Sequence, residues 1–405
     1  MNRTSTKIIF TICTAFLLFF AAFFVTQSVN IAYAEEIQAP TATVTGACGA
    51  NATWNYYEDI STLEITGSGS VNTYNVGATP WYSYADNIKK IIVNDGITGI
   101  SSGIFSGMSA LEELTIPFVG SNKFCYYFGT DSYTNSYSVR NYYYQNYNST
   151  SPSYSSTYYY IPGNLRKVSV TKASYIPECA FVECTSITEI KLNEGITSIE
   201  KSAFEKCTSL EKINLPSTLT DIRLRAFYNC TKLDNVEIPG TVTVIGDYAF
   251  SGCKALTTNI GSGVITIGNC AFSGCISLGN QTFPSTLTSI GSSAFSGCTS
   301  FTEINLPMTV TSVGSYAFSN CSTIEKISIE EGVKTIGTYA FQNINKVTNL
   351  VIPTTVTSMG ASIFSGMSAL EELTIPFVDS NKFCYYFGTD SYTNSYSVRN
   401  YYYQN

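Results

Sequence analysis

Seven cysteines recur at nearly constant spacing, and their thiols are the side chains of this sequence that most suggest chemistry. The intervals are 22 or 23 residues, and the series is Cys184, Cys207, Cys230, Cys253, Cys275, Cys298 and Cys321. If each interval is one turn of a stacked structure, the thiols form a column whose spacing is compatible with disulfides. A column of thiolates would also suggest a metal site.

We favour buried free thiols over disulfides and over a metal. Elsewhere the same slot holds Met108, Ile344 and Met367, so the position selects a modest hydrophobic side chain. The series has an odd number of cysteines, and the sequence has no CxxC motif and no histidine to complete a zinc site. We therefore predict no metal and no cofactor, with disulfides as the alternative.

Acid–base and nucleophilic catalysis have little support. The absence of histidine removes the commonest general base and the usual partner of a serine or cysteine nucleophile. Three carboxylate pairs, Glu112-Glu113, Glu330-Glu331 and Glu371-Glu372, could in principle supply an acid and a base. Adjacent residues of a strand point to opposite faces, so we interpret these pairs as solvated surface. We predict that the protein is not an enzyme and has no catalytic residue.

Residues 118–160 carry a candidate binding site. Twelve of these 43 residues are tyrosine, a density that neither a core nor a spacer requires. Tyrosine mixed with serine and asparagine is typical of adaptable binding surfaces, and aromatic rings also suit sugars. The expected contact residues are Tyr142, Tyr143, Tyr144, Tyr147, Tyr154 and Tyr158. The alternative is a loop that packs on the rest of the protein or covers its side.

A repeat of about 23 residues runs through the sequence and predicts the secondary-structure elements that position these side chains. Phenylalanine, usually after alanine, recurs at Phe181, Phe204, Phe227, Phe250, Phe272, Phe295, Phe318, Phe341 and Phe364. Within one unit, Ile213 and Leu215 alternate like a short strand, and Pro216 ends it because proline cannot extend a ladder. One unit cannot fold alone, so units must stack and share their hydrophobic faces. This predicts a right-handed solenoid of short parallel β-strands.

Some coils depart from the pattern. Ahead of Phe105, Tyr82 stands where the phenylalanine is expected. One residue is missing between Phe250 and Phe272, so that Asn259 is expected in the inward slot of its coil, and Gln281 is misplaced in the next. We interpret these two coils as a weak point or bend rather than as a polar functional site.

The clearest motifs are A-F-S-G-C-T-S at residues 294–300, I-N-L-P at 304–307 and V-T-S-V-G at 310–314. Through them the chain resembles the BspA-type leucine-rich repeat family over about residues 82–405, apart from insertions. Proline replaces the asparagine or cysteine that follows the strand in the common leucine-rich repeat. The resemblance implies a leucine-rich-repeat solenoid with short helical or 3-10 turns, in a secreted or cell-surface protein used for adhesion or binding.

Charge and the N-terminus limit the partners and the location. The net charge of −7 argues against nucleic acid, whose phosphates need a basic footprint. Arg3 and Lys7, the apolar residues 8–25 and the A-x-A site at 32–34 predict a secretory signal peptide, with an uncleaved transmembrane anchor as the alternative. No later segment is apolar enough to cross a bilayer, so we expect a secreted or cell-surface protein.

We divide the chain into six segments: a signal peptide (1–34), an N-terminal β-rich capping unit (35–81), first leucine-rich repeats (82–117), a Tyr/Ser/Asn-rich insertion (118–160), further repeats (161–376) and a truncated second copy of the insertion (377–405). The expected function is non-enzymatic binding or adhesion to an extracellular protein or glycan. The alternatives are a carbohydrate-binding or a structural stalk region of a larger secreted protein. The expected exposed strand positions are Glu189, Lys191, Lys212, Asn214, Asn235, Glu237, Glu303, Asn305 and Lys326.

The end of the sequence repeats an earlier part. Residues 363–405 match residues 104–146 with one difference, Gly120 against Asp379. Because the second copy stops inside the insertion without a capping coil, we hypothesise that the sequence is a fragment. Residues 377–405 are then expected to be poorly ordered.

Overall fold

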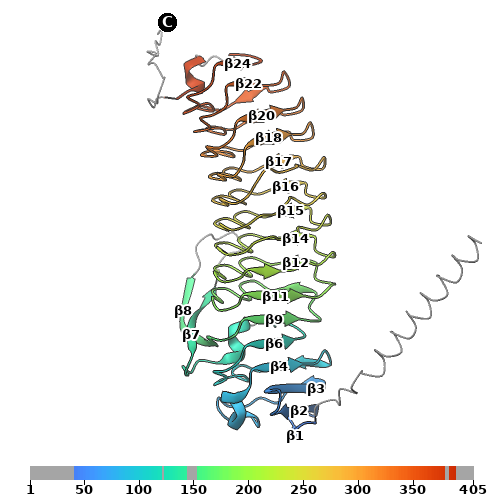
Figure 1. The fold of residues 1–405 in the computed structure, drawn as a ribbon. Helices are drawn as coiled ribbons and strands as arrows, with labels where there is room; N and C mark the ends of the chain where they lie inside the picture. The colour runs from blue at the N-terminus through green and yellow to red at the C-terminus, as the bar shows by residue number, and fades with distance from the viewer. Residues whose placement is uncertain (1–40, 121–122, 144–152, 379–382, 389–405) are drawn as a thin grey trace, which may run out of the picture. The chain divides into compact units, whose positions relative to one another are not determined.

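The computed structural model describes residues 41–120, 123–143, 153–378 and 383–388. The chain divides into two compact units, Met1–Ala42 and Thr43–Asn405, and almost all described residues belong to the second. That unit is a β-solenoid of about 12 turns with very little helix, whose coils stack along one axis (Figure 1). The predicted stacked, parallel-stranded solenoid is confirmed. The expected signal peptide lies outside the described residues, and so do residues 379–382 and 389–405 of the segment 377–405 expected to be poorly ordered.

One row of strands forms the first face of the solenoid, because each I-x-L segment pairs with the same segment of the next coil. After β3 (Thr62–Ser70) the pairing is parallel through β4 (Lys90–Val93), β6 (Glu113–Ile116), β9 (Lys167–Val170), β11 (Glu189–Leu192) and β13 (Lys212–Ile213). The ladder then stops, and two parallel pairs follow: β18 (Glu303–Leu306) with β20 (Lys326–Ile329), and β22 (Asn349–Val351) with β24 (Glu372–Thr374).

A second row, formed by the V-x-x-V/I-G segments, is continuous. Its two-residue strands all pair in parallel: β10 (Tyr175–Ile176), β12 (Ser198–Ile199), β14 (Asp221–Ile222), β15 (Val244–Ile245), β16 (Thr266–Ile267), β17 (Ser289–Ile290), β19 (Ser312–Val313), β21 (Thr335–Ile336) and β23 (Ser358–Met359). The three-residue strand β5 (Ile97–Gly99) pairs with β3.

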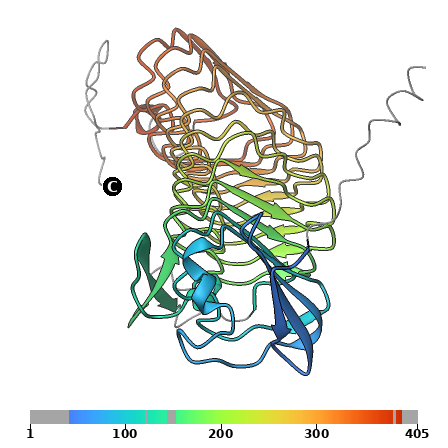
Figure 2. The ribbon, with the colours of Figure 1, turned by 60° about the horizontal axis from the view of Figure 1, so that its bottom comes forward.

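Antiparallel strands lie at the N-terminal end of the stack (Figure 2). Here β1 (Val44–Ala47) pairs with β2 (Asn51–Tyr57), and β2 pairs with β3. The 3-10 helix η1 (Tyr82–Asn87) follows. The expectation that Tyr82 fills the phenylalanine slot is wrong: Tyr82 is 44% exposed and Trp81 is fully buried. Trp81 packs edge-on against Trp54 and donates its indole N–H to the Ile104 carbonyl, so the larger ring closes this end of the core.

The core is a column of stacked phenylalanines. From Phe181 to Phe341, neighbouring ring centroids lie 5.0–6.1 Å apart, with planes within 15° of parallel. The backbone sets this spacing, because the Phe204 N–H donates to the carbonyl of Ala226 one coil later, and the same bond recurs along the stack. The alanine that precedes each phenylalanine from Phe181 to Phe341 is buried, and isoleucine takes the same buried position before Phe105 and Phe364.

Two coils carry the irregularity that the sequence indicates. The missing residue places Thr258 and Ile260 inward and leaves Asn259 exposed, so the expected inward position of Asn259 is wrong. Gln281 does occupy the inward slot and is buried. Its amide accepts a hydrogen bond from the Ile260 N–H and donates to the carbonyls of Thr258 and Gly279, at 2.9–3.0 Å. A side chain thus makes the contacts that strand pairing makes in regular coils.

The segment expected to break the repeat begins inside the core. Phe128 lies 23 residues after Phe105, and the 3-10 helix η2 (Phe124–Phe128) carries three fully or nearly buried aromatic rings. Phe124 lies 4.7 Å from Phe181 between ring centroids, so it joins the phenylalanine column. The chain then leaves the stack as an antiparallel hairpin, β7 (Ser136–Tyr143) and β8 (Ser153–Pro162), at the side of the solenoid (Figures 1 and 2).

Candidate functional site

The cysteine column is structural in its surroundings. All seven predicted members are buried, which confirms the predicted burial, and their sulfur atoms are free thiols. From Cys207 onward each thiol donates to the carbonyl of the phenylalanine one coil earlier, with sulfur–oxygen distances of 2.9–3.2 Å. Met108, Ile344 and Met367 are buried in the same slot, as expected. A thiol here is a small apolar group with one weak hydrogen bond.

Cys125 is a further member of this column that the repeat spacing does not reveal. Burial, and to a smaller extent the neighbouring thiols of Cys207 and Cys125, raise the pKa of Cys184 well above its ordinary value. Burial also raises the pKa of Cys125 to about 12. Protonated, enclosed thiols are poor nucleophiles and poor metal ligands. Among the described residues, no group of three or more Cys, Asp or Glu side chains is arranged to hold a metal ion.

The tyrosine-rich hairpin is anchored on the solenoid through one of its faces. The Tyr137 hydroxyl accepts a hydrogen bond from the Ser186 hydroxyl, and burial raises the pKa of Tyr137 well above its ordinary value. Tyr159, opposite the buried Val139, contacts Tyr126 edge-on at 4.4 Å between ring centroids. Packing on the rest of the protein therefore explains part of the tyrosine content.

Of the six predicted contact tyrosines, the structure describes the side chain of Tyr158 alone, which is 37% exposed. Tyr142 and Tyr143 lie in β7 and Tyr154 lies in β8, with Tyr142 opposite Tyr154, but their side chains are outside the described part of the chain. Tyr144 and Tyr147 lie outside the described residues altogether. A shared tyrosine surface therefore stays a prediction.

A groove of about 1000 Å³ opens on the first strand face beside β11 and β13; we call it the strand-face groove. Five of the nine expected exposed strand positions line it. Its lining residues are Glu189, Ile190, Lys191, Leu192, Glu211, Lys212, Ile213, Asn214, Thr231, Lys232, Asp234, Asn235 and Ala255.

The groove lies where the first row of strands is interrupted. Asn235 has a φ of 46°, in the left-handed region, so the backbone leaves the extended conformation and β13 gains no strand partner from the next coil. Asn214 joins its coil to the preceding one, because its side-chain amide exchanges two 2.8 Å hydrogen bonds with the backbone of Leu192. The groove therefore has a rigid wall and an apolar floor of Ile190 and Ile213.

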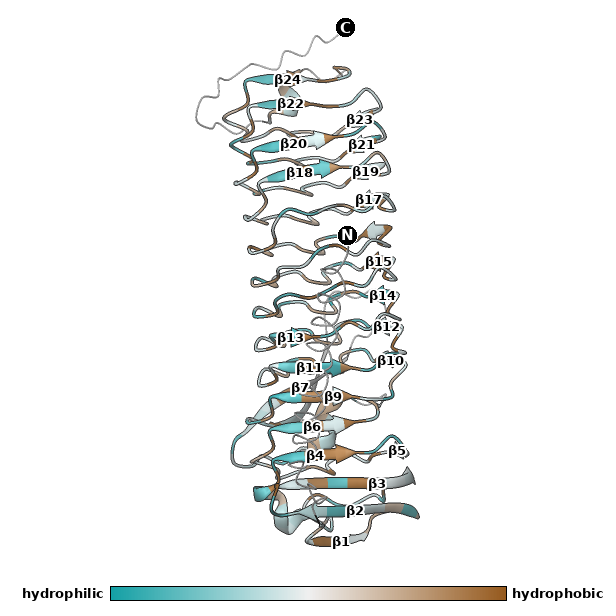
Figure 3. Ribbon diagram, turned by 45° about the vertical axis from the view of Figure 1, so that its right-hand side comes forward, coloured by the Kyte–Doolittle hydropathy of each residue, from teal (hydrophilic) through white to brown (hydrophobic). Residues whose placement is uncertain are grey.

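Charges of alternating sign lead up to the groove. The first outward residues of successive strands are cross-strand partners in the order Lys90, Glu113, Lys167, Glu189 and Lys212. In Figure 3 these strand beginnings are hydrophilic. The Lys167 ammonium lies 2.9 Å from Glu113, and this hydrogen bond lowers the pKa of the Glu113 carboxyl. We call these five residues the charge ladder.

The carboxylate pairs are surface groups, as expected. Glu112 is exposed and Glu113 is half-buried, and both are ion-paired with neighbouring lysines, at 3.6 Å for Lys89 with Glu112. Glu330-Glu331 and Glu371-Glu372 are also exposed. No acid–base pair in a pocket results from them.

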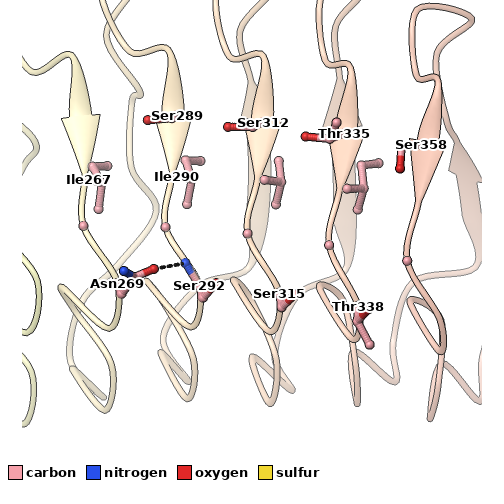
Figure 4. A pocket seen from close by; sticks show the side chains of 17 residues that line it. Ile267, Asn269, Ser289, Ile290, Ser292, Ser312, Ser315, Thr335, Thr338 and Ser358 are labelled. Carbon is pink, nitrogen blue, oxygen red and sulfur yellow. Dashed lines mark hydrogen bonds between the residues drawn. The ribbon is translucent and has the colours of Figure 1, made fainter.

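A second groove, of about 560 Å³, runs along the second row of strands from β16 to β23 (Figure 4). Short hydroxyl side chains line it, among them Ser289, Ser312 and Thr335, and its floor is a column of glycines. A Cβ on Gly291 would lie 2.5 Å from the Gly268 carbonyl carbon, so close coil stacking requires glycine there. The lining has no ionisable side chain, so this groove offers hydrogen bonds without charge.

The stacked coils, the two parallel strand rows and the surface grooves define a leucine-rich-repeat solenoid protein. A model of the BspA type leucine rich repeat region matches residues 78–164, 152–279 and 266–398, with six copies. The chain belongs to the BspA-type leucine-rich repeat family. Among the described residues, none forms a helix that is both long enough and apolar enough to span a membrane.

Several solved structures are similar to this chain. A leucine rich cell surface protein from Faecalibacterium prausnitzii is 21% identical, with 84% of this chain and 97% of that chain covered and a TM-score of 0.37. A leucine-rich repeat protein from Eubacterium ventriosum is 18% identical, with coverages of 85% and 98% and a TM-score of 0.34. The pneumococcal vaccine antigen PcpA is 14% identical, with coverages of 81% and 80% and a TM-score of 0.37. No curated protein matches the chain.

Proposed function

We propose that this protein is exported, is displayed at the cell surface or secreted, and binds an extracellular protein or glycan without catalysing a reaction. The observation that carries the proposal is the strand-face groove on a rigid stack of coils. A continuous buried core holds its wall in place, so a ligand is met by a preformed surface. Membership of a family of repeat scaffolds supports the same reading.

The first test separates display from binding. Labelling of intact cells with a membrane-impermeant reagent is expected to modify the protein, and purified full chain is expected to retain a ligand from panels of extracellular proteins and glycans. Replacing Lys191 and Lys212 by serine should weaken retention about tenfold, because both ammonium groups line the groove. The matched control replaces Lys326 and Lys334, which are exposed outside the groove, and should leave retention unchanged. Failure of the wild-type chain to retain any ligand would contradict the proposal, whereas equal retention by both variants would show that the ligand binds outside the groove.

The hairpin β7–β8 is a second candidate contact surface. It forms its own two-stranded sheet, and Tyr158 is exposed opposite Arg140. An exposed tyrosine offers a large amphipathic surface to a protein or a sugar ring. Tyr158→Ser should then weaken retention, whereas Tyr175→Ser, at a similarly exposed tyrosine on the solenoid itself, should not.

A further inference from the structure

We infer that the strand-face groove binds an extended acidic segment of another protein, with one ligand carboxylate beside Lys212. This inference rests on the proposed function and names the partner of the same surface. The charge ladder supplies the first step of the argument. Within it, Glu113 lies between Lys90 and Lys167 and contacts both, at 3.6 and 2.9 Å, and Glu189 is the next cross-strand partner. Each lysine position of the ladder thus has a glutamate as its neighbour.

The ladder ends on a cation. The residue that follows Lys212 by one repeat of 23 is Asn235, a neutral side chain, where alternation would place a carboxylate. No ion pair involves Lys212 within the described part of the chain. Its ammonium is exposed at the wall of the groove. A carboxylate brought by a ligand would take the place that a glutamate occupies in the preceding coils.

The other charges that line the groove are already engaged. Lys191 lies 3.5 Å from Glu189, and Lys232 lies 4.0 Å from Glu211. The Asp234 carboxylate accepts hydrogen bonds from the Asn235 N–H and the Thr257 hydroxyl. Of the three lysines that line the groove, Lys212 is thus the one with no ion-pair partner among the described residues, so its ammonium is the one open to a ligand carboxylate.

The floor and the size of the groove favour a polypeptide. Ile190, Leu192 and Ile213 line the groove beneath Lys212 but are at most 8% exposed, so a ligand side chain next to the acidic one meets only the apolar edges of these residues. None of the lining residues is aromatic, so the groove has no ring on which a sugar could stack. The volume of about 1000 Å³ accommodates several residues of extended chain. These features together fit a segment in which acidic and apolar residues alternate.

The test uses the full chain and three blocked, fluorescein-labelled hexapeptides that alternate valine with glutamate, glutamine or lysine. Fluorescence anisotropy should show binding of the glutamate peptide, and binding should weaken as salt is raised because the contact is electrostatic. The glutamine and lysine peptides should bind at least about tenfold more weakly. Equal affinity for the glutamate and glutamine peptides would overturn the inference.

Two variants test the role of the charge. Lys212→Glu reverses it, and Asn235→Asp supplies the missing carboxylate from within the chain. Aspartate is nearly the same size as asparagine and also tolerates a left-handed backbone, so the second variant should keep the fold. Both should weaken binding of the glutamate peptide about tenfold. Lys326→Glu changes the equivalent strand position outside the groove, opposite Glu303, and should leave binding within about twofold.

The remaining outcomes separate this inference from the proposed function. Binding of polygalacturonate that depends on Lys212, without binding of the peptide, would identify an acidic glycan as the occupant and overturn the assignment of a protein segment. If the full chain retains its extracellular ligand and Lys212→Glu and Asn235→Asp retain it equally, the groove is not the site, while the proposed function stands. If the wild-type chain retains no ligand and binds no peptide, both fail.

Discussion

At the residue scale, one slot of the repeat explains both the regular cysteines and their lack of reactivity. Each thiol lies inside the stack, and from Cys207 onward each donates to a carbonyl of the preceding coil, as Cys230 does to Phe204 at 3.0 Å. The slot also accepts methionine and isoleucine, so volume and apolarity decide its occupant. Because the buried site disfavours a charged thiolate, folding raises the pKa of these thiols.

The buried thiols should make stability fall at alkaline pH. Burial raises the pKa of Cys321 from 9.0 to about 12, so below pH 9 the thiol is protonated in both states and its contribution to stability is complete. Between pH 9 and 12 the unfolded chain loses this proton while the folded chain keeps it, so the free energy of unfolding falls as pH rises. From pH 8 to 10, urea unfolding of Cys321→Ala should lose about 1 kcal/mol less than the wild type.

Tyrosines and lysines titrate in the same pH range. The quantity to compare is therefore the difference between the wild type and Cys321→Ala in the free energy of unfolding lost from pH 8 to 10. Equal losses in both would contradict burial of the Cys321 thiol. Titration with a thiol reagent at pH 8 complements the unfolding measurement. The thiols of the cysteine column should be unreactive in the native protein and should react once the protein is unfolded. Absence of free thiol in the unfolded protein would instead establish the disulfide alternative.

At the element scale, side chains replace strand pairing where the first strand row is interrupted. Gln281 bridges two coils through two hydrogen bonds and makes a third within its own coil, and Asn214 bridges two coils through two. Both satisfy backbone groups that a β-ladder would otherwise pair, which keeps the coils stacked without strands. Asn214 is also one of the residues that line the strand-face groove, whereas Gln281 lies outside that lining.

Replacing Gln281 by leucine should destabilise the protein, although leucine is more apolar and the slot is inward. The change leaves the Ile260 N–H and the Thr258 carbonyl buried without a partner, at an expected cost of about 1–3 kcal/mol in the free energy of unfolding. Ile304→Leu, in the same slot of the next coil, should cost less than about 1.5 kcal/mol. Chemical denaturation measures both. A Gln281→Leu protein as stable as the wild type would show that the bridge contributes nothing.

At the scale of the whole molecule, the burial of a coil's side chains depends on whether other coils pack against both of its faces. The duplicated segments provide an internal comparison, because residues 121–128 and 380–387 have the same sequence. Phe124 is fully buried beneath the coil that carries Phe181, whereas Phe383 is 47% exposed. Identical side chains thus differ in burial through their neighbours alone.

Hydrogen exchange should register this difference. The backbone amides of residues 124–128 are expected to exchange at least about tenfold more slowly than those of residues 383–387, because opening the first segment requires separating two packed coils. Intrinsic exchange rates are equal, since the local sequences are identical. Peptides that span Gly120 or Asp379 distinguish the copies by mass. Equal protection of both segments would show that coil stacking does not control local stability here.

Local pattern determined the solenoid. The spacing of phenylalanine, cysteine and the I-x-L segments is enough to predict parallel stacking, a buried thiol column and polar strand positions, because one periodic unit buries its apolar face only against copies of itself. The repeat pattern did not predict which single residue faces inward in the irregular coils. Trp81 is buried in place of Tyr82, and Thr258 is buried in place of Asn259, because the packing of the whole coil determines which of two neighbours faces the core.

Tertiary structure alone decided the candidate site. Glu113 and Lys167 are 54 positions apart in the sequence and become partners because the hairpin between them leaves the stack and returns in register. The same step brings Phe124 against Phe181 and Cys125 into the thiol column. The groove requires the left-handed backbone at Asn235, which ends the strand row beside Lys212, a residue that makes no ion pair with any described residue. Contacts between distant segments are fixed by three-dimensional stacking, and a linear pattern of residue types does not contain them.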